Sequence, residues 1–184
     1  DKDLMEPDNS YRWGATDSNL YLMHKIDILK CELERINPEI FIDANRENLT
    51  ANTLKKIYDR YDAIVFTVGS SDFQYEANKL LKEKNYQGRA IFVWLEAGGN
   101  YSHILCVNYS NPGCYQCLFT DSEGNITANQ YNREKDDTLC SMVIRNACGG
   151  TRAAYGNAIL LRTTAVLLEY MKRIFEKGLE ENWL

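Results

Sequence analysis

Apolar residues recur at a helical spacing of three to four positions in several stretches of the chain. The first stretch ends at Asn37–Pro38, because the residue before a proline avoids the helical region. Thr50 is suited to cap the next helix, since its hydroxyl can accept a hydrogen bond from a first-turn amide. The pattern predicts helices over residues 19–37, after Thr50, over 72–86 and over 155–176.

Short apolar runs alternate with these helices. Residues 63–68 (AIVFTV) and 90–95 (AIFVWL) are apolar throughout, which is typical of strands buried on both faces. Further strands are expected over 40–42 and 103–109. Strands that alternate with helices predict an α/β fold, with a Rossmann-like, mostly parallel sheet and helices on both faces.

The expected domain organisation is a single domain over residues 1–184. A doubly wound sheet normally starts with a strand, a Gly-rich turn and a helix, and we expect this chain to lack that first βα unit, which would precede Asp1. Residues 111–138 are polar with weak periodicity, and we expect a mobile loop over 120–140, because loops of such length are usually functional or mobile.

Composition and charge narrow the class of protein. The 184 residues are 45% hydrophobic and carry a net charge of −5, which is ordinary for a soluble globular protein. Nucleic acid is not expected as a partner, because phosphate binding needs clustered Lys and Arg. No apolar run has the length of a membrane span, and no signal peptide is evident. We therefore expect a cytoplasmic protein that does not bind membranes.

Polar residues follow a definite spacing in the first 38 residues, D-x-D-x5-N-x2-R-x12-K-x11-N-P. The positions are Asp1, Asp3, Asn9, Arg12, Lys25, Asn37 and Pro38. This spacing resembles the adenylation domain of the ThiF/MoeB/E1 family, the ubiquitin-activating type of enzyme. Any one of these residues alone would be read as a solvated surface charge, but the joint spacing is much rarer.

The resemblance implies roles for these residues. Asp1 would bind the ATP ribose, and Asn9, Arg12 and Lys25 would reach the phosphates, with Arg12 and Lys25 counted as catalytic. A carboxylate suits ribose hydroxyls, and fixed cations suit a reacting phosphate. The family's glycine-rich phosphate loop would precede Asp1, so this chain alone is expected to bind ATP weakly and to be inactive.

One position departs from the family pattern. The family usually places an Mg²⁺-binding Asp after its next buried strand, and the matching residue here is Gly69. Asp72 is a candidate ligand for the metal and equally a candidate N-cap of the following helix, and both interpretations stay open. A glycine also allows a ligand close to the backbone, so Gly69 is expected to line the nucleotide site.

The segment 93–119 resembles the family's strand, Gly-containing loop, strand and CxxCL motif. Its W-x-E…H form is most similar to adenylation domains fused or linked to E2-like modules in bacterial anti-phage operons. Glu96 and His103 are its notable residues. We favour a buried, hydrogen-bonded His and a surface acid over functional roles for either, because a single His is weak evidence.

Six cysteines are present, and without secretory features reduced thiols are expected. Cys114 and Cys117 form a CxxC, which in many family members supplies half of a four-thiolate zinc site. The chain has no second CxxC, so zinc is less favoured, and a redox pair remains an alternative. Cys31 and Cys106 are expected in the core.

Cys148 lies in A-C-G-G-T, just before the last predicted helix. The segment resembles the one that carries the reactive cysteine of ThiF-type and E1-type enzymes. A helix start with Arg145 and Arg152 nearby would stabilise a thiolate nucleophile. The alternatives are a small buried Cys at a helix entry, and Cys140 as the nucleophile.

The resemblance implies ATP- and Mg²⁺-dependent adenylation of the C-terminal carboxylate of a ubiquitin-like protein or another protein with an exposed tail, followed by a thioester on Cys148. It also implies a homodimer, and an E2-like module remains open. The alternatives are a sulfur-carrier adenylyltransferase of the ThiF/MoeB kind and a non-catalytic module that binds a nucleotide or a protein tail.

Overall fold

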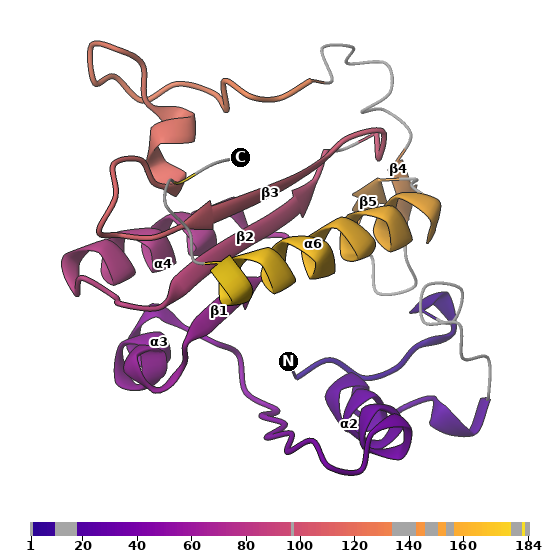
Figure 1. Cartoon of the computed structure of the whole chain (residues 1–184). Coiled ribbons are helices and arrows are strands. Elements are labelled where there is room, and N and C mark those ends of the chain that lie inside the picture. Colours follow the sequence, from indigo (N-terminus) through magenta and orange to yellow (C-terminus); the bar gives the residue numbers. More distant parts are fainter. Residues whose placement is uncertain are drawn as a thin grey trace. The chain divides into compact units, whose positions relative to one another are not determined.

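The computed structural model describes residues 2–9, 18–96, 98–133, 143–145, 151–153, 157–177 and 182 (Figure 1). Contacts between residues divide the chain into two compact units. The first covers the chain up to Leu49 and the second begins at Thr50. No helix in the described part of the chain is long and apolar enough to cross a membrane.

The described part of the first unit is built around the α-helix α2. It contains η1 (Pro7–Asn9), η2 (Ser18–Leu20) and α2 (Lys25–Ile36). The predicted helix over 19–37 is confirmed but begins later, because Leu22 has a φ of 67°, which a right-handed helix does not allow. Its end at Asn37 is confirmed, since Asn37 is the C-cap. Fully buried Met5 pairs through its backbone with Leu22 and Met23.

Two predictions for this unit are wrong. Residues 40–42 form no strand, and Phe41 is 91% exposed. Among the described residues, none pairs with these three as a strand, and an unpaired run of three residues is not a stable strand. Cys31 is exposed rather than buried in a core, because it lies on a side of α2 that faces solvent.

The second unit carries the main sheet and, among the described elements, most of the helices. Its described elements are α3 (Ala51–Ile57), η3 (Tyr58–Arg60), β1 (Ala63–Phe66), α4 (Ser71–Glu83), β2 (Arg89–Leu95), β3 (Ser102–Val107), η4 (Tyr115–Phe119), β4 (Val143–Arg145), β5 (Thr151–Ala153) and α6 (Asn157–Lys177).

The main sheet has the order β1-β2-β3 (Figure 1). β1 and β2 are parallel, with Ala63 opposite Arg89, and α4 forms the connection between them. β3 is antiparallel to β2, which it follows after a short turn. β4 and β5 form a separate antiparallel pair. Two of the three strands in the main sheet are therefore parallel, and the predicted α/β class is confirmed.

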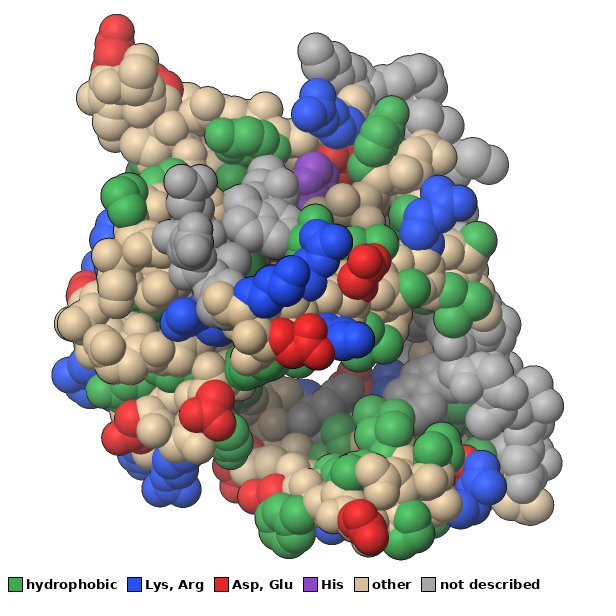
Figure 2. Space-filling model, viewed as in Figure 1, with side chains coloured by type: hydrophobic (Ala, Val, Ile, Leu, Met, Phe, Trp, Pro, Cys, Tyr) green, Lys and Arg blue, Asp and Glu red, His purple; other side chains and the backbone are tan. Residues whose placement is uncertain are grey.

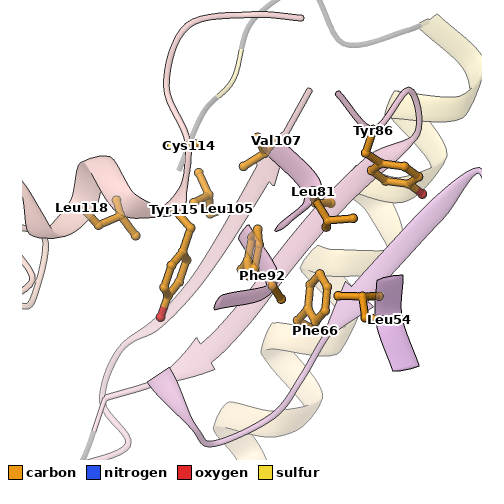
Figure 3. Close-up of a cluster of buried hydrophobic side chains, with 12 residues drawn as sticks. Leu54, Phe66, Leu81, Tyr86, Phe92, Leu105, Val107, Cys114, Tyr115 and Leu118 are labelled. Atoms are coloured by element: carbon orange, nitrogen blue, oxygen red, sulfur yellow. The ribbon is translucent and has the colours of Figure 1, made fainter. Parts of the chain in front are cut away.

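One face of the sheet is covered by α3, α4 and η4. Aromatic rings fill the space beneath them: Phe66 stacks on Phe92 at 4.9 Å between ring centres, and Phe92 lies 4.8 Å from Tyr115. Figure 3 shows these rings with Leu54 and Leu81 beside them. We call this the α4 face. It contains most of the buried apolar side chains among the described residues.

The opposite face is covered by α6, and we call it the α6 face (Figure 1). Ile91 and Cys106 of the sheet pack there against Ile174 of α6. Figure 2 shows charged side chains of both signs over the outer side of α6. Lys172 and Glu176 form one ion pair along this helix, and Glu169 and Arg173 form another. The helices on both faces confirm the predicted arrangement.

Candidate functional site

Several predicted site residues lie outside the described residues. These are Asp1, Arg12 and Cys148, together with Cys140, the alternative nucleophile. The structure describes the other three, Asn9, Lys25 and Gly69. Asn9 and Lys25 belong to the first unit, and Gly69 belongs to the second.

Lys25 is the first residue of α2 and is held by Asp3. Its Nζ lies 3.6 Å from Asp3 Oδ2, and its side chain is 18% exposed. The backbone reinforces the pair, because Lys25 N donates to Asp3 O at 3.0 Å. Asp3 therefore has a structural role: it fixes the direction of a half-buried ammonium group, as a phosphate-binding lysine would need.

Asn9 is buried at the end of η1. Its Oδ1 accepts a hydrogen bond from the backbone N–H of Glu6 at 3.1 Å, and the backbone N–H of Asn9 donates to Glu6 O at 2.9 Å. These contacts fold the side chain back onto its own turn. The turn holds Asn9 in one orientation, which suits either a local structural role or a fixed amide that meets a ligand.

Gly69 follows the carboxyl end of β1. A Cβ at this position would meet no atom within 4 Å, so space is open beside it. Ser70 is the N-cap of α4, because its Oγ accepts from Phe73 N at 3.2 Å. The prediction of Asp72 as a cap is therefore wrong, and Asp72 lies within the first turn of the helix.

The described residues do not provide the carboxylate that the family places after this strand to hold Mg²⁺. Gly69 has no side chain, and Asp72 is displaced into the first turn of α4. Mg²⁺ requires near-octahedral oxygen ligands at short distances, so a displaced acid is no simple replacement. The residues at this position do not fit the family's usual metal site.

Glu96 and His103 form a buried pair at the end of β2 and the start of β3. His103 Nε2 lies 2.5 Å from Glu96 Oε1, and both side chains are less than 10% exposed. The His103 ring stacks on Trp94 with 4.8 Å between ring centres. The expectation of a buried, hydrogen-bonded His is confirmed. The expectation of a surface acid is wrong, because the β2–β3 turn encloses Glu96.

Glu96 also holds a distant segment of the chain. The backbone amide of Arg133 donates to Glu96 Oε1 at 2.8 Å. Glu96 N donates to Tyr101 O at 3.0 Å, and Gly99 closes the turn with a φ of 70°. One buried carboxylate therefore joins the β2–β3 turn to the chain 37 residues further on.

The loops at Gly69 and Glu96 leave the sheet at the same edge. β1 and β2 are parallel neighbours, and both segments follow the carboxyl ends of these strands. In open α/β sheets, ligands bind in the crevice outside these ends. This edge is therefore the candidate site of the second unit. Gly69 gives it open space, and the Glu96–His103 pair gives it polar groups.

Cys114 and Cys117 lie next to each other at the start of η4. Their Sγ atoms are 3.8 Å apart, and Lys82 Nζ lies 3.7 Å from Cys114 Sγ. Burial raises the pKa of Cys114, but the neighbouring Asn78, Lys82 and Cys117 more than offset this, so the pKa lies below its usual value. Cys114 is buried, whereas Cys117 is exposed.

The described residues do not gather a closed zinc site around this pair. A structural zinc site needs four ligands. Among the residues that the structure describes, no group of three or more His, Cys, Asp or Glu side chains could hold a metal ion. Cys106 is buried in β3, as predicted, and its burial raises the pKa of its thiol to about 11.

Sequence reasoning missed two contacts of these sites. Asn78 and Lys82 are four residues apart on α4, so helical spacing could have placed them on one side of the helix. Their position beside Cys114, 32 residues beyond Lys82, has no local signal. The contact between Arg133 and Glu96 has none either, because it uses a backbone amide.

The sheet, its two layers of helices and its polar carboxyl edge define the class of α/β proteins that bind ligands at that edge. A model of the ThiF family matches residues 1–181, and the chain belongs to the ThiF family. This is a family of adenylyltransferase-type enzymes, of the E1-like or the sulfur-carrier kind. A search of the curated proteins gives no match.

Proposed function

We propose that this chain is the adenylation domain of an E1-like activating enzyme. It would use ATP to adenylate the C-terminal carboxylate of a ubiquitin-like or similar protein. The family match over residues 1–181 carries this proposal. The spacing of Asn9 and Lys25 in the first unit, and the polar sheet edge in the second, support it.

In the first step, a carboxylate oxygen of the partner's tail attacks the α-phosphorus of ATP, and pyrophosphate leaves. Arg12 and Lys25 offset the negative charge that grows on the phosphate oxygens. Asp3 contributes by fixing the Lys25 ammonium before the reaction, so that little reorganisation is needed. Asn9 adds a hydrogen bond to the phosphates, and Asp1 accepts hydrogen bonds from the ribose.

In the second step, the Cys148 thiolate attacks the carbonyl carbon of the acyl adenylate. A thioester forms and AMP leaves, which divides one difficult acyl transfer into two easier steps. The thioester could then pass to an E2-like module. A second copy of the chain would complete the site as a homodimer.

A non-catalytic binding module is the second candidate, and Gly69 favours it. The described residues lack the expected carboxylate at this position, so metal-assisted adenylation would need a ligand from elsewhere. Such a module would bind a nucleotide or a protein tail without turnover. A sulfur-carrier adenylyltransferase would share the first step and differ in its partner protein.

ATP–pyrophosphate exchange in the full-length parent protein tests the proposal, with ubiquitin-like and sulfur-carrier proteins as candidate partners. We expect partner-dependent exchange that Lys25→Ala lowers by about 10²-fold, the usual loss when one charge-stabilising group is removed. Lys30→Ala is the matched control. Lys30 lies on the same helix, and its ion pair there is with Glu34, one turn further on.

The thioester step is tested separately with Cys148→Ala. This variant should keep exchange and lose a thiol-sensitive adduct detected by mass spectrometry under non-reducing conditions. Retention of the adduct would move the nucleophile to another residue, Cys140 first. Failure of the full-length protein both to bind ATP and to exchange pyrophosphate would contradict the enzyme proposal and favour a module that binds a protein tail.

A further inference from the structure

Cys114 and Cys117, at the start of η4, differ from the other described cysteines because their sulfurs lie close together and an ammonium group lies beside one of them. Cys114 Sγ has a second sulfur 3.8 Å away and an ammonium group 3.7 Å away. Cys31 is a single exposed thiol, and Cys106 is a single buried one. Only in the pair, among the described cysteines, can one sulfur react with the other without a change of fold.

The positions of the two sulfurs are fixed by α4. Asn78 is fully buried on this helix, and its Oδ1 accepts hydrogen bonds from Tyr115 N and from Tyr109 Oη, both at 3.2 Å. Tyr115 follows Cys114 directly, so the turn that carries the pair is anchored to the helix. Lys82, one turn further along α4, then reaches Cys114.

The pair is asymmetric in a way that suits two different roles. Cys117 is exposed and can meet a reagent from solution. Cys114 is only 5% exposed, so a bulky reagent cannot reach it directly, but it lies in contact with Cys117. Lys82 stabilises the thiolate form of Cys114, which is the form that attacks a disulfide.

We propose that Cys114 and Cys117 form a thiol–disulfide exchange site, which low-molecular-weight disulfides of the glutathione type convert reversibly to an intramolecular disulfide. Neither thiol has a place in the proposed adenylation chemistry, so this site does not depend on that function.

The reaction has two balanced steps. Cys117 loses its proton and its sulfur attacks oxidised glutathione, which gives a mixed disulfide on Cys117 and releases one glutathione thiolate. The Cys114 thiolate then attacks the Cys117 sulfur, which forms the Cys114–Cys117 bond and releases the second glutathione thiolate. The two cysteines are oxidised by two electrons, one glutathione disulfide is reduced to two thiols, and reduced glutathione reverses the sequence.

The test uses the full-length protein, reduced and then exchanged into buffers of defined oxidised and reduced glutathione. Remaining thiols are alkylated, and peptides are mapped by mass spectrometry. We expect Cys114 and Cys117 to lose their thiols together and to regain them with excess reduced glutathione. Cys31→Ser is the matched control, since it removes an exposed thiol outside the pair and should leave this behaviour unchanged.

Three variants separate the roles of these residues. Cys114→Ser should accumulate the stable mixed disulfide on Cys117, and Lys82→Met should slow its conversion severalfold. Cys117→Ser, a change at an exposed position, should protect Cys114 from the reagent. Any of three results would overturn the proposal: stoichiometric zinc held by the pair that blocks oxidation, a mixed disulfide that persists in the unaltered protein, or independent oxidation of the two thiols.

Discussion

The two faces of the main sheet are packed very differently. The α4 face stacks Phe66, Phe92 and Tyr115 beneath three helical elements, whereas the α6 face buries Ile91, Cys106 and Ile174 beneath one helix. Neighbouring residues of β2 point to opposite faces, so one strand that is apolar from Ala90 to Leu95 supplies both faces. The apolar sequence of the strand indicates that both faces are covered, but it does not indicate how many side chains pack on each face.

The comparison predicts that replacing a buried side chain by Ala lowers the free energy of unfolding more on the α4 face than on the α6 face. Phe92→Ala should destabilise the protein by about 3–5 kcal/mol, because it leaves a cavity in the aromatic stack. Ile174→Ala on the α6 face should cost about 2 kcal/mol, at the low end for its type. Urea unfolding measures both, and equal losses would contradict the difference between the faces.

The polar edge of the sheet gives the next effect. Glu96→Gln removes the charge that faces His103 but keeps a similar shape, and we expect a loss of about 2 kcal/mol. Thermal unfolding compares it with Glu76→Gln, a change on α4 outside this pair. A loss of stability no greater than that of the control would show that the charge of Glu96 adds nothing to the stability of the folded protein.

The start of α4 gives a smaller effect. Ser70→Ala removes the hydroxyl that accepts from Phe73 N, and such a cap contributes about 1 kcal/mol. Thr50→Ala at the cap of α3 should behave alike, because its hydroxyl accepts from Thr53 N at 3.2 Å. If urea unfolding shows no loss in either variant, packing of the α4 face alone fixes where these helices begin.

The smallest effect at neutral pH is expected from Tyr115→Phe, which keeps the ring in the α4 face. Burial raises the pKa of Tyr115 from 10 to about 12. The folded protein therefore holds this proton where the unfolded chain has lost it, and stability falls as the pH rises from 10 towards 12. The variant should show a shallower alkaline loss in unfolding curves; an unchanged slope would mean that Tyr115 ionises normally.

The sequence predicts the sheet best where its signals are local. The uniformly apolar runs place β1 and β2 within two residues at each end, and Thr50 is the expected cap. Residues 40–42 have the same local character but pair with none of the described strands, and the prediction fails there. Local pattern identifies a strand only when the fold supplies its partner.

The candidate site is less predictable for the same reason. The spacing that led to Lys25 carries no sign that Asp3 would hold its ammonium group, although both belong to the motif. Glu96 has the residue type of a surface acid, and its burial depends on groups 7 and 37 residues away. Contacts between distant segments, rather than residue types, decide which polar groups become fixed.

The bond between Glu96 and the amide of Arg133 also limits which sequences this fold accepts. Since the donor is a backbone N–H, any amino acid except proline at position 133 can supply it. Homologous chains are therefore free to vary the side chain there without losing the attachment. We therefore expect position 133 to vary widely among homologous sequences and to exclude proline.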